Sequence, residues 1–134
     1  MSKQSSPNGL QISEEDFDAL PFGIIRIDRA GRILQYNAFE SELSGQSVAD
    51  VTGRNFFKDI APCTDVADFH GRLLDTTPDE IVNMQFPFTF PFEHPRRVFI
   101  HIVSGPRKSY WIFVSEAATN RTLQALLKRD QDKE

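Results

Sequence analysis

Several features that would direct a protein out of the cell, into a membrane or onto nucleic acid are missing from this sequence of 134 residues. Cys63 is the only cysteine, so no internal disulfide can form and the fold does not depend on an oxidising compartment. Residues 1–9 lack the apolar segment of a signal peptide, and no apolar run approaches the ~20 residues that span a bilayer. With 15 basic and 19 acidic residues, no basic stripe for nucleic acid emerges. We therefore expect a cytoplasmic protein that binds neither membrane nor nucleic acid.

Apolar residues are plentiful, and phenylalanine is unusually common. Twelve phenylalanines, within a hydrophobic share of 40%, can fill one core in a chain of this length. Hydrophobic spacing and turn residues predict strands at residues 22–28, 33–36, 86–92, 98–103 and 110–114, and helices near 13–20, 37–45, 64–74 and 117–129. This order predicts an α+β fold with an antiparallel sheet of about five strands and helices on one side.

The same patterns divide the chain into three parts. Residues 1–20 form a polar N-terminal segment with a short helix, residues 21–116 form the single domain, and residues 117–134 form a C-terminal helical extension. The helix expected at 117–129 has one narrow leucine face and is too short to be stable alone. We expect it to dock on its own domain or on another copy of the chain.

The strand expected at residues 86–92 has a distinctive composition. Phenylalanine occupies every second position, which predicts one wholly aromatic face. Pro87 and Pro91 lie at the alternate positions and cannot donate backbone hydrogen bonds. This strand is therefore expected at an edge of the sheet.

Cys63 is the first candidate functional residue. A lone cysteine is usually a small buried apolar residue, but this one follows Pro62 and precedes Thr64 and Asp65, either of which could cap a helix running to about residue 74. Backbone N–H groups at such a helix start would stabilise a thiolate. The histidines, His70, His94 and His101, have no ligand spacing that would favour zinc. A thiol-dependent hydrolase in which Cys63 pairs with a histidine stays open.

Glu40 is the second candidate, and it has two interpretations. Asn37 followed by Glu40 nearly matches a capping box, in which the acid bonds back to the capping residue, and this spacing favours the cap. However, Tyr36, Glu40 and Ser44 are spaced by four and would face one way on a helical turn. These three side chains could instead form one polar cluster.

Three segments give this chain a family resemblance. The strings ILQYNA at residues 33–38, followed by Glu40, GRNFFKDIAPCTD at residues 53–65, and SYWIFV at residues 109–114 resemble the photoactive yellow proteins, and the likeness runs from about Leu20 to Val114. The segment around Cys63 is highly specific. The resemblance implies a PAS fold, in which a five-stranded antiparallel sheet is flanked by short helices.

The resemblance also implies a chromophore. Cys63 would carry p-coumaric acid (4-hydroxycinnamic acid) as a thioester, Tyr36 and Glu40 would hydrogen-bond its phenolate, and Ser44 would bond the tyrosine. The other residues implied at the chromophore are Phe56, Ile60, Phe90 and His94. The implied function is that of a blue-light photoreceptor, not an enzyme. Light would isomerise the chromophore from trans to cis, Glu40 would give it a proton, and partial unfolding would signal to a downstream protein.

Some positions depart from the family pattern. Gln46 stands where the family commonly has arginine, and Phe88 and Phe92 stand where tyrosine is frequent. His94 lies near the position of a methionine that speeds dark recovery in the family. A PAS-like interaction module without chromophore therefore remains an alternative to the photoreceptor, and the thiol-dependent hydrolase is the less favoured one. A homodimer through the termini is also possible.

Overall fold

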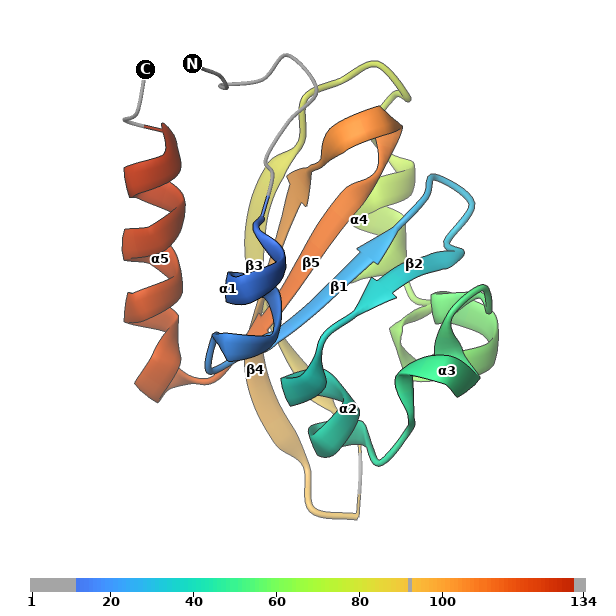
Figure 1. Ribbon diagram of the computed structural model, residues 1–134. Coiled ribbons are helices and arrows are strands. Elements are labelled where there is room, and N and C mark those ends of the chain that lie inside the picture. The colour runs from blue at the N-terminus through green and yellow to red at the C-terminus, as the bar shows by residue number, and fades with distance from the viewer. Residues whose placement is uncertain (1–11, 92, 132–134) are drawn as a thin grey trace.

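The fold is built on one antiparallel sheet. The computed structural model describes residues 12–91 and 93–131, with side chains as far as residue 128. Five strands pair in the spatial order β2-β1-β5-β4-β3 (Figure 1). Their bounds are Gly23–Ile27 for β1, Ile33–Tyr36 for β2, Asn83–Phe90 for β3, Arg96–Ser104 for β4 and Tyr110–Ser115 for β5. The predicted five-stranded antiparallel sheet is confirmed.

The helices are short, except the last. They are α1 (Glu14–Ala19), α2 (Ala38–Ser44), α3 (Val48–Val51), a π-helical turn η1 (Phe56–Ile60), a 3₁₀ turn η2 (Pro62–Thr64), α4 (His70–Leu74), a second 3₁₀ turn η3 (Pro106–Lys108) and α5 (Ala117–Gln131). Within the described parts of the chain, none of these helices is long and apolar enough to cross a membrane.

Local capping explains where α2 begins and ends. The side-chain oxygen of Asn37 accepts the Glu40 N–H at 3.0 Å, which satisfies a donor in the first turn. Gly45 follows the helix with φ of 76°, a left-handed conformation that glycine adopts at little cost, and its N–H donates to the Ser41 carbonyl. Both predicted boundaries of this helix are confirmed.

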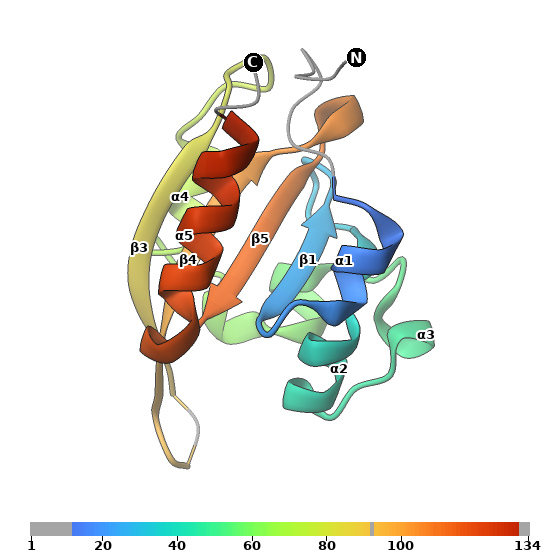
Figure 2. The same cartoon turned by 60° about the vertical axis from the view of Figure 1, so that its left-hand side comes forward.

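Helices cover both faces of the sheet, so the expectation of helices on one side was wrong. Figure 2 shows α1 and α5 in front of the sheet, with α4 behind it. The reason lies in the central strands, which are apolar at successive residues: Trp111 and Ile112 of β5 are both buried, on opposite faces. A strand of this kind must be covered twice.

The helix α5 docks on its own domain, which is one of the two alternatives predicted for it. Leu123 is fully buried and Leu127 nearly so, and both pack in a cluster with Phe22, Trp111 and Phe113. Phe17 of α1 packs in the same cluster, with its ring centroid 6.0 Å from that of Trp111. We call this face of the sheet the closed face.

The helix expected at residues 64–74 is largely absent, which corrects that prediction. The Thr64 hydroxyl donates to the Ala61 carbonyl at 2.7 Å instead of capping a helix. The Asp65 carboxylate is bonded to Nδ1 of His70 at 2.7 Å. With neither residue available as a cap, a regular helix begins only at His70, and Cys63 lies in the single 3₁₀ turn η2.

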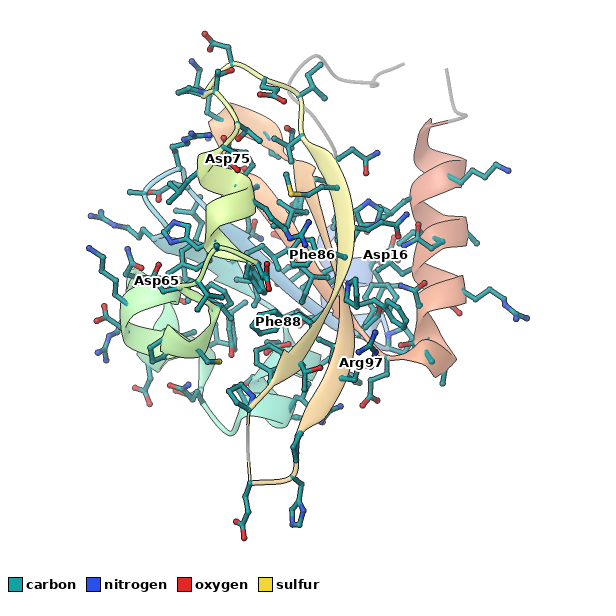
Figure 3. All side chains as sticks on the ribbon, turned by 180° about the vertical axis from the view of Figure 1, so that it is seen from behind. Asp16, Asp65, Asp75, Phe86, Phe88 and Arg97 are labelled. Atoms are coloured by element: carbon teal, nitrogen blue, oxygen red, sulfur yellow. The ribbon has the colours of Figure 1, made fainter. Side chains whose placement is uncertain are left out.

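Strand β3 is an edge strand, as Pro87 within it and Pro91 just beyond it predict. It pairs with β4 alone, from Asn83 opposite Val103 to Phe90 opposite Arg96. Phe86 and Phe88 point from β3 toward α4, where both rings contact Phe69 (Figure 3). Phe92, which was expected to end the aromatic face, lies outside the described residues.

Candidate functional site

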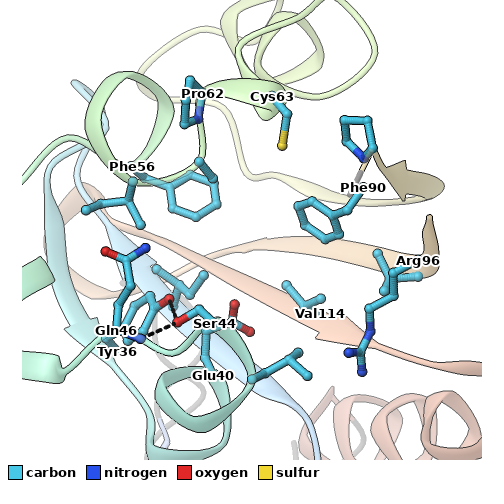
Figure 4. A pocket seen from close by; sticks show the side chains of 16 residues that line it. Tyr36, Glu40, Ser44, Gln46, Phe56, Pro62, Cys63, Phe90, Arg96 and Val114 are labelled. Carbon is cyan, nitrogen blue, oxygen red and sulfur yellow. Dashed lines mark hydrogen bonds between the residues drawn. The ribbon is translucent and has the colours of Figure 1, made fainter. Parts of the chain in front are cut away.

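A cavity of about 410 Å³ lies between the helical segments and the face of the sheet opposite α5 (Figure 4). We call this face the cavity face. Seven of the eight residues predicted to bind a cofactor line this cavity: Tyr36, Glu40, Ser44, Phe56, Ile60, Cys63 and Phe90. The remaining lining residues are mostly apolar: Ile25, Leu43, Gln46, Ala61, Pro62, Pro91, Arg96, Val98 and Val114.

His94 is the predicted residue that the structure does not bring to the cavity. It lies exposed in the turn between β3 and β4 and is not among the lining residues. Gln46, which stands where the resembled family commonly has arginine, does line the cavity. The position of His94 therefore separates it from the other seven residues.

Cys63 presents its sulfur to the cavity from the turn η2 (Figure 4). It follows Pro62 at the start of this turn, and the turn ends at Thr64. Burial raises the pKa of the Cys63 thiol, and the hydrogen bond from its backbone N–H, the kind of stabilisation expected for a thiolate, only opposes that rise. The thiol lines the cavity, and the net upward direction of its pKa does not favour the thiolate.

Tyr36 and Ser44 form a hydrogen-bonded pair in the cavity wall. The Tyr36 hydroxyl donates to Oγ of Ser44 at 2.9 Å, and the same Oγ accepts the N–H of Gln46 at 3.2 Å (Figure 4). Burial raises the pKa of Tyr36 to about 12, although the bond to Ser44 opposes the rise. Tyr36 belongs to β2 and Ser44 to α2, so their hydrogen bond joins residues eight positions apart across a strand-to-helix junction.

Glu40 does not close a capping box. The N–H of Asn37, which the carboxyl of Glu40 would have to accept, donates instead to the Ile24 carbonyl at 3.0 Å. Within the described residues, Oε1 of Glu40 is buried without a hydrogen-bond partner. This oxygen lies so close to Gly23 that a side chain at that position would collide with it. The side chain of Glu40 therefore points into the cavity and leaves the cap to Asn37.

The surroundings of Glu40 favour its neutral form. Burial raises its pKa to about 7, while the positive charge of Arg96 opposes the rise. A protonated carboxyl has an O–H donor as well as an acceptor oxygen. Tyr36 and Glu40 can thus present two donors to one acceptor in the cavity, which is the arrangement that a buried anionic oxygen needs.

Arg96 is a cavity residue that the sequence analysis missed. It opens β4 and lies opposite Phe90 of β3. The signal was present in the sequence, because alternation along β4 places residue 96 on the same face as Val98 and Ile100, which are buried. A charged residue in register with buried aliphatic residues is a candidate for a functional role.

None of the three histidines is among the residues that line the cavity with Cys63. His70 is bonded to Asp65 and stacks on Phe57, with ring centroids 3.7 Å apart. His101 lies on the closed face, where it contacts Asn83 and Gln124. In the described part of the chain, no group of three potential ligands could hold a metal ion. The geometry thus gives no support to a Cys–His hydrolase.

Comparisons with known proteins agree with this fold and site. The sequence model of the PAS fold matches residues 15–112. The chain is 44% identical over 107 residues to the photoactive yellow protein of Rhodothalassium salexigens, which covers 77% of this chain and 84% of that protein. It is 37% identical over 105 residues to the photoactive yellow protein of Halochromatium salexigens, with the same coverage.

A solved structure gives the same result. The photoactive yellow protein domain of the sensor histidine kinase Ppr from Rhodospirillum centenum superposes with a TM-score of 0.72 at 42% identity, over 78% of this chain and 94% of that domain. The matched PAS region contains the whole sheet except the end of β5. With its cavity lined by Cys63, Tyr36 and Glu40, this chain belongs to the photoactive yellow protein family of PAS-fold proteins.

Proposed function

We propose that this chain is a blue-light photoreceptor that holds p-coumaric acid as a thioester on Cys63. The observation that carries the proposal is the buried Glu40 carboxyl, whose Oε1 has no hydrogen-bond partner in the described residues and which shares one cavity with the thiol. A buried polar atom without a partner needs an explanation, and a ligand supplies one. The family membership supports the same conclusion.

The residues fit such a group. The cavity, at about 410 Å³, falls in the range of ~300–1,000 Å³ typical of small-molecule sites. Its walls are mostly apolar, as an aromatic ring requires, and besides Cys63 its polar side chains are Tyr36, Glu40, Ser44, Gln46 and Arg96. A free carboxylate carries no good leaving group, so attachment to Cys63 needs an activated acid. The sulfur then forms the thioester bond, the activating group leaves, and the thiol proton goes to solvent.

Tyr36 and Glu40 would stabilise the anionic end of the chromophore. Burial of a phenolate without donors is strongly unfavourable. Each hydrogen bond to a charged group contributes about 1.5–3 kcal/mol, so two donors offset about 3–6 kcal/mol of that cost. Glu40 can donate only when protonated, and its raised pKa, about 7, provides this form. Ser44 accepts from Tyr36 in the absence of a ligand, and its rotatable hydroxyl can stay bonded to Tyr36 as a donor.

Glu40 would also convert light into a structural signal. The bound chromophore supplies absorption of blue light and trans-to-cis isomerisation of its double bond. Glu40 then gives its carboxyl proton to the phenolate oxygen and remains as a carboxylate. That charge lies in a buried and mostly apolar site, where an ionised group without partners is unfavourable. The resulting loss of structure would be read by a downstream signalling protein.

The attachment is tested with Cys63→Ala. The wild-type chain, incubated with activated p-coumaric acid, should turn yellow and bleach in blue light. The variant should fold but remain colourless, because the chain contains no other thiol. A mass increase of the variant by one chromophore would contradict the attachment. A wild type that folds but takes up no chromophore would favour the PAS interaction module.

The role of Glu40 is tested with Glu40→Gln, and Glu42→Gln on the exposed part of the same helix is the matched control. An amide is a weaker acid than a carboxylic acid, so charge on the phenolate would be more delocalised and absorption should move to longer wavelength. Infrared difference spectra should show loss of a protonated-carboxyl band on illumination of wild type and of Glu42→Gln, but not of Glu40→Gln. The same wavelength in all three proteins, with no such band, would refute the proposed role.

A further inference from the structure

Arg96 connects the cavity to the beginning of α5. Its side chain lines the cavity together with Glu40 (Figure 4). Its Nη2 also forms an ion pair with Oε2 of Glu116 at 2.8 Å. Glu116 lies between β5 and α5, and its carbonyl accepts the N–H groups of Thr119 at 3.0 Å and Asn120 at 2.8 Å. One arginine thus contacts both the candidate site and the residue at which the C-terminal helix starts.

The arginine is incompletely bonded where it stands. Within the described residues, its Nε is buried without a hydrogen-bond partner. Its ion pair with Glu116 is partly exposed, since the two side chains are 30% and 52% accessible. Exposed ion pairs of this kind contribute little to stability because water screens them. The Arg96–Glu116 pair can therefore be displaced by a stronger competitor.

Glu40 becomes such a competitor when it loses its proton. The attraction between two opposite charges is larger in a buried site than near the surface, because the effective dielectric constant is lower. Arg96 already interacts electrostatically with Glu40, and a guanidinium is the side-chain cation best suited to pair with a buried carboxylate. The ionised carboxyl would lack other cations, because Arg96 is the only charged base among the lining residues in the described part of the chain.

We propose that Arg96 exchanges partners: it pairs with Glu116 while Glu40 is protonated, and it turns to Glu40 when Glu40 ionises, which loosens the first turns of α5. The light-driven version rests on the proposed function, but the exchange itself requires only an ionised Glu40. The loosening is local, because Leu123 and Leu127 remain packed on the sheet. Arg96 is thus a positioning residue: through its change of partner, ionisation of Glu40 loosens the start of α5 at the surface.

Titratable groups in the same cavity and on the helix packed against α2 must stay constant in the test. Tyr36 of β2 and Cys63 of η2 line the same cavity. Asp18 of α1 accepts the Ala38 N–H at the start of α2 at 2.7 Å. None of them is changed in the variants chosen below.

The first test measures the pKa of Glu40 by carboxyl NMR in the chromophore-free full chain. Glu116→Gln should lower this pKa, because Arg96 is then free to pair with Glu40. Arg96→Gln should raise it, because the positive charge that opposes the rise is gone. Asp79→Asn breaks another exposed ion pair, with Lys108, and should leave it unchanged. If Glu116→Gln does not lower the pKa, the exchange is refuted.

The second test follows α5 by amide hydrogen exchange at a pH above the pKa of Glu40, with Glu40→Gln measured at the same pH. Wild type should exchange up to about fivefold faster over residues 117–122 than Glu40→Gln, which keeps the Arg96–Glu116 pair. Glu116→Gln should exchange at the faster rate, with or without an ionised Glu40. Equal rates in wild type and Glu40→Gln would overturn the proposal.

Illumination of the loaded chain separates this proposal from the photoreceptor function. A chain that turns yellow and bleaches, but in which Glu116→Gln leaves the pKa of Glu40 unchanged, refutes the exchange alone. A chain that takes up no chromophore, but shows the expected changes in pKa and hydrogen exchange, refutes the photoreceptor function and supports the exchange.

Discussion

The two faces of the sheet are both covered by helical segments, but one is filled by side chains and the other contains a cavity. On the closed face, the ring centroids of Phe22 and Phe113 lie 6.2 Å apart, and Leu123 of α5 packs in the same buried cluster. A buried polar residue there, His101, has a partner at each ring nitrogen, Asn83 at 2.6 Å and Gln124 at 3.1 Å. The cavity face leaves about 410 Å³ open and contains two buried polar atoms without partners among the described residues.

The difference shows which kind of buried polar group indicates function. Asn37 is fully buried, but its side chain bonds to four backbone groups, in Phe17, Phe22, Ile24 and Glu40. Its role is structural, because it connects α1, β1 and α2. Glu40, three residues later, has a buried carboxyl oxygen that bonds to nothing in the described chain. Burial is common to both, and only the missing partner marks the site.

The largest expected effect is a loss of stability on truncating a ring of the closed face, compared with truncating a ring of the cavity. Phe113→Ala removes a fully buried ring from the closed face and should lower the free energy of unfolding by about 3–5 kcal/mol, with little change in the absorption of the loaded protein. Phe90→Ala removes a half-buried ring that lines the cavity, so it should cost less stability but shift the absorption. Denaturant unfolding and absorption spectra of both variants test this contrast. Equal effects on both properties would remove the distinction between the faces.

The next effect concerns the pH dependence of stability without chromophore. Glu40 has a pKa of about 7 in the folded chain against 4.5 for the ordinary group, so its stabilising contribution is complete below pH 4.5 and is lost as the pH rises through 7. At about 1.4 kcal/mol per pKa unit, the loss is about 3 kcal/mol. Glu40→Gln should remove this loss, and Glu42→Gln should retain it.

His101, on the closed face, makes stability change with pH in the opposite direction. Burial lowers the pKa of His101, so its contribution is present above its ordinary value and lost as the pH falls. The test is therefore the difference in the free energy of unfolding between wild type and Glu40→Gln, from pH 4.5 to pH 8. A difference that does not vary with pH would mean that Glu40 is exposed.

A smaller effect is expected at Gly23, which leaves room for Glu40. Gly23→Ala should force the carboxyl of Glu40 aside, at a cost of about 1–3 kcal/mol, and should weaken the pH dependence just described. Gly71→Ala is the control, because a Cβ there meets Ala67 at an ordinary distance of 3.5 Å and lies in a helix. Thermal unfolding of both variants over a pH series checks this. If Gly23→Ala behaves like Gly71→Ala, Glu40 is not held against β1.

The smallest effect is expected at His94. This residue is exposed and lies outside the cavity lining, so His94→Met should leave the absorption maximum of the loaded protein unchanged. The family resemblance predicts that a methionine there speeds dark recovery, which flash spectroscopy of wild type and variant measures separately. A shifted absorption maximum would show that the turn between β3 and β4 reaches the chromophore.

The sequence by itself determined the local structure around the site. Asn37 and Gly45 set the ends of α2 because a side-chain cap and a left-handed glycine act within one helical turn. The alternating phenylalanines, with Pro87 and Pro91, predicted an edge strand because side-chain direction and N–H donors depend only on position along the strand. The motif around Cys63 indicated the family before any cavity was visible.

Only the tertiary structure decided what Glu40 does. Its spacing from Asn37 suits a capping box and its spacing from Tyr36 suits a cluster, so the sequence alone left both interpretations possible. The Ile24 carbonyl, from a neighbouring strand, takes the Asn37 N–H and removes the first possibility. The pairing of β3 with β4 places Arg96 beside Phe90 at the cavity. The closed face is covered because α5 folds back on it. Whether a side chain is buried depends on contacts with segments that are distant in the sequence. Burial can therefore be assigned only once those segments are placed together in space.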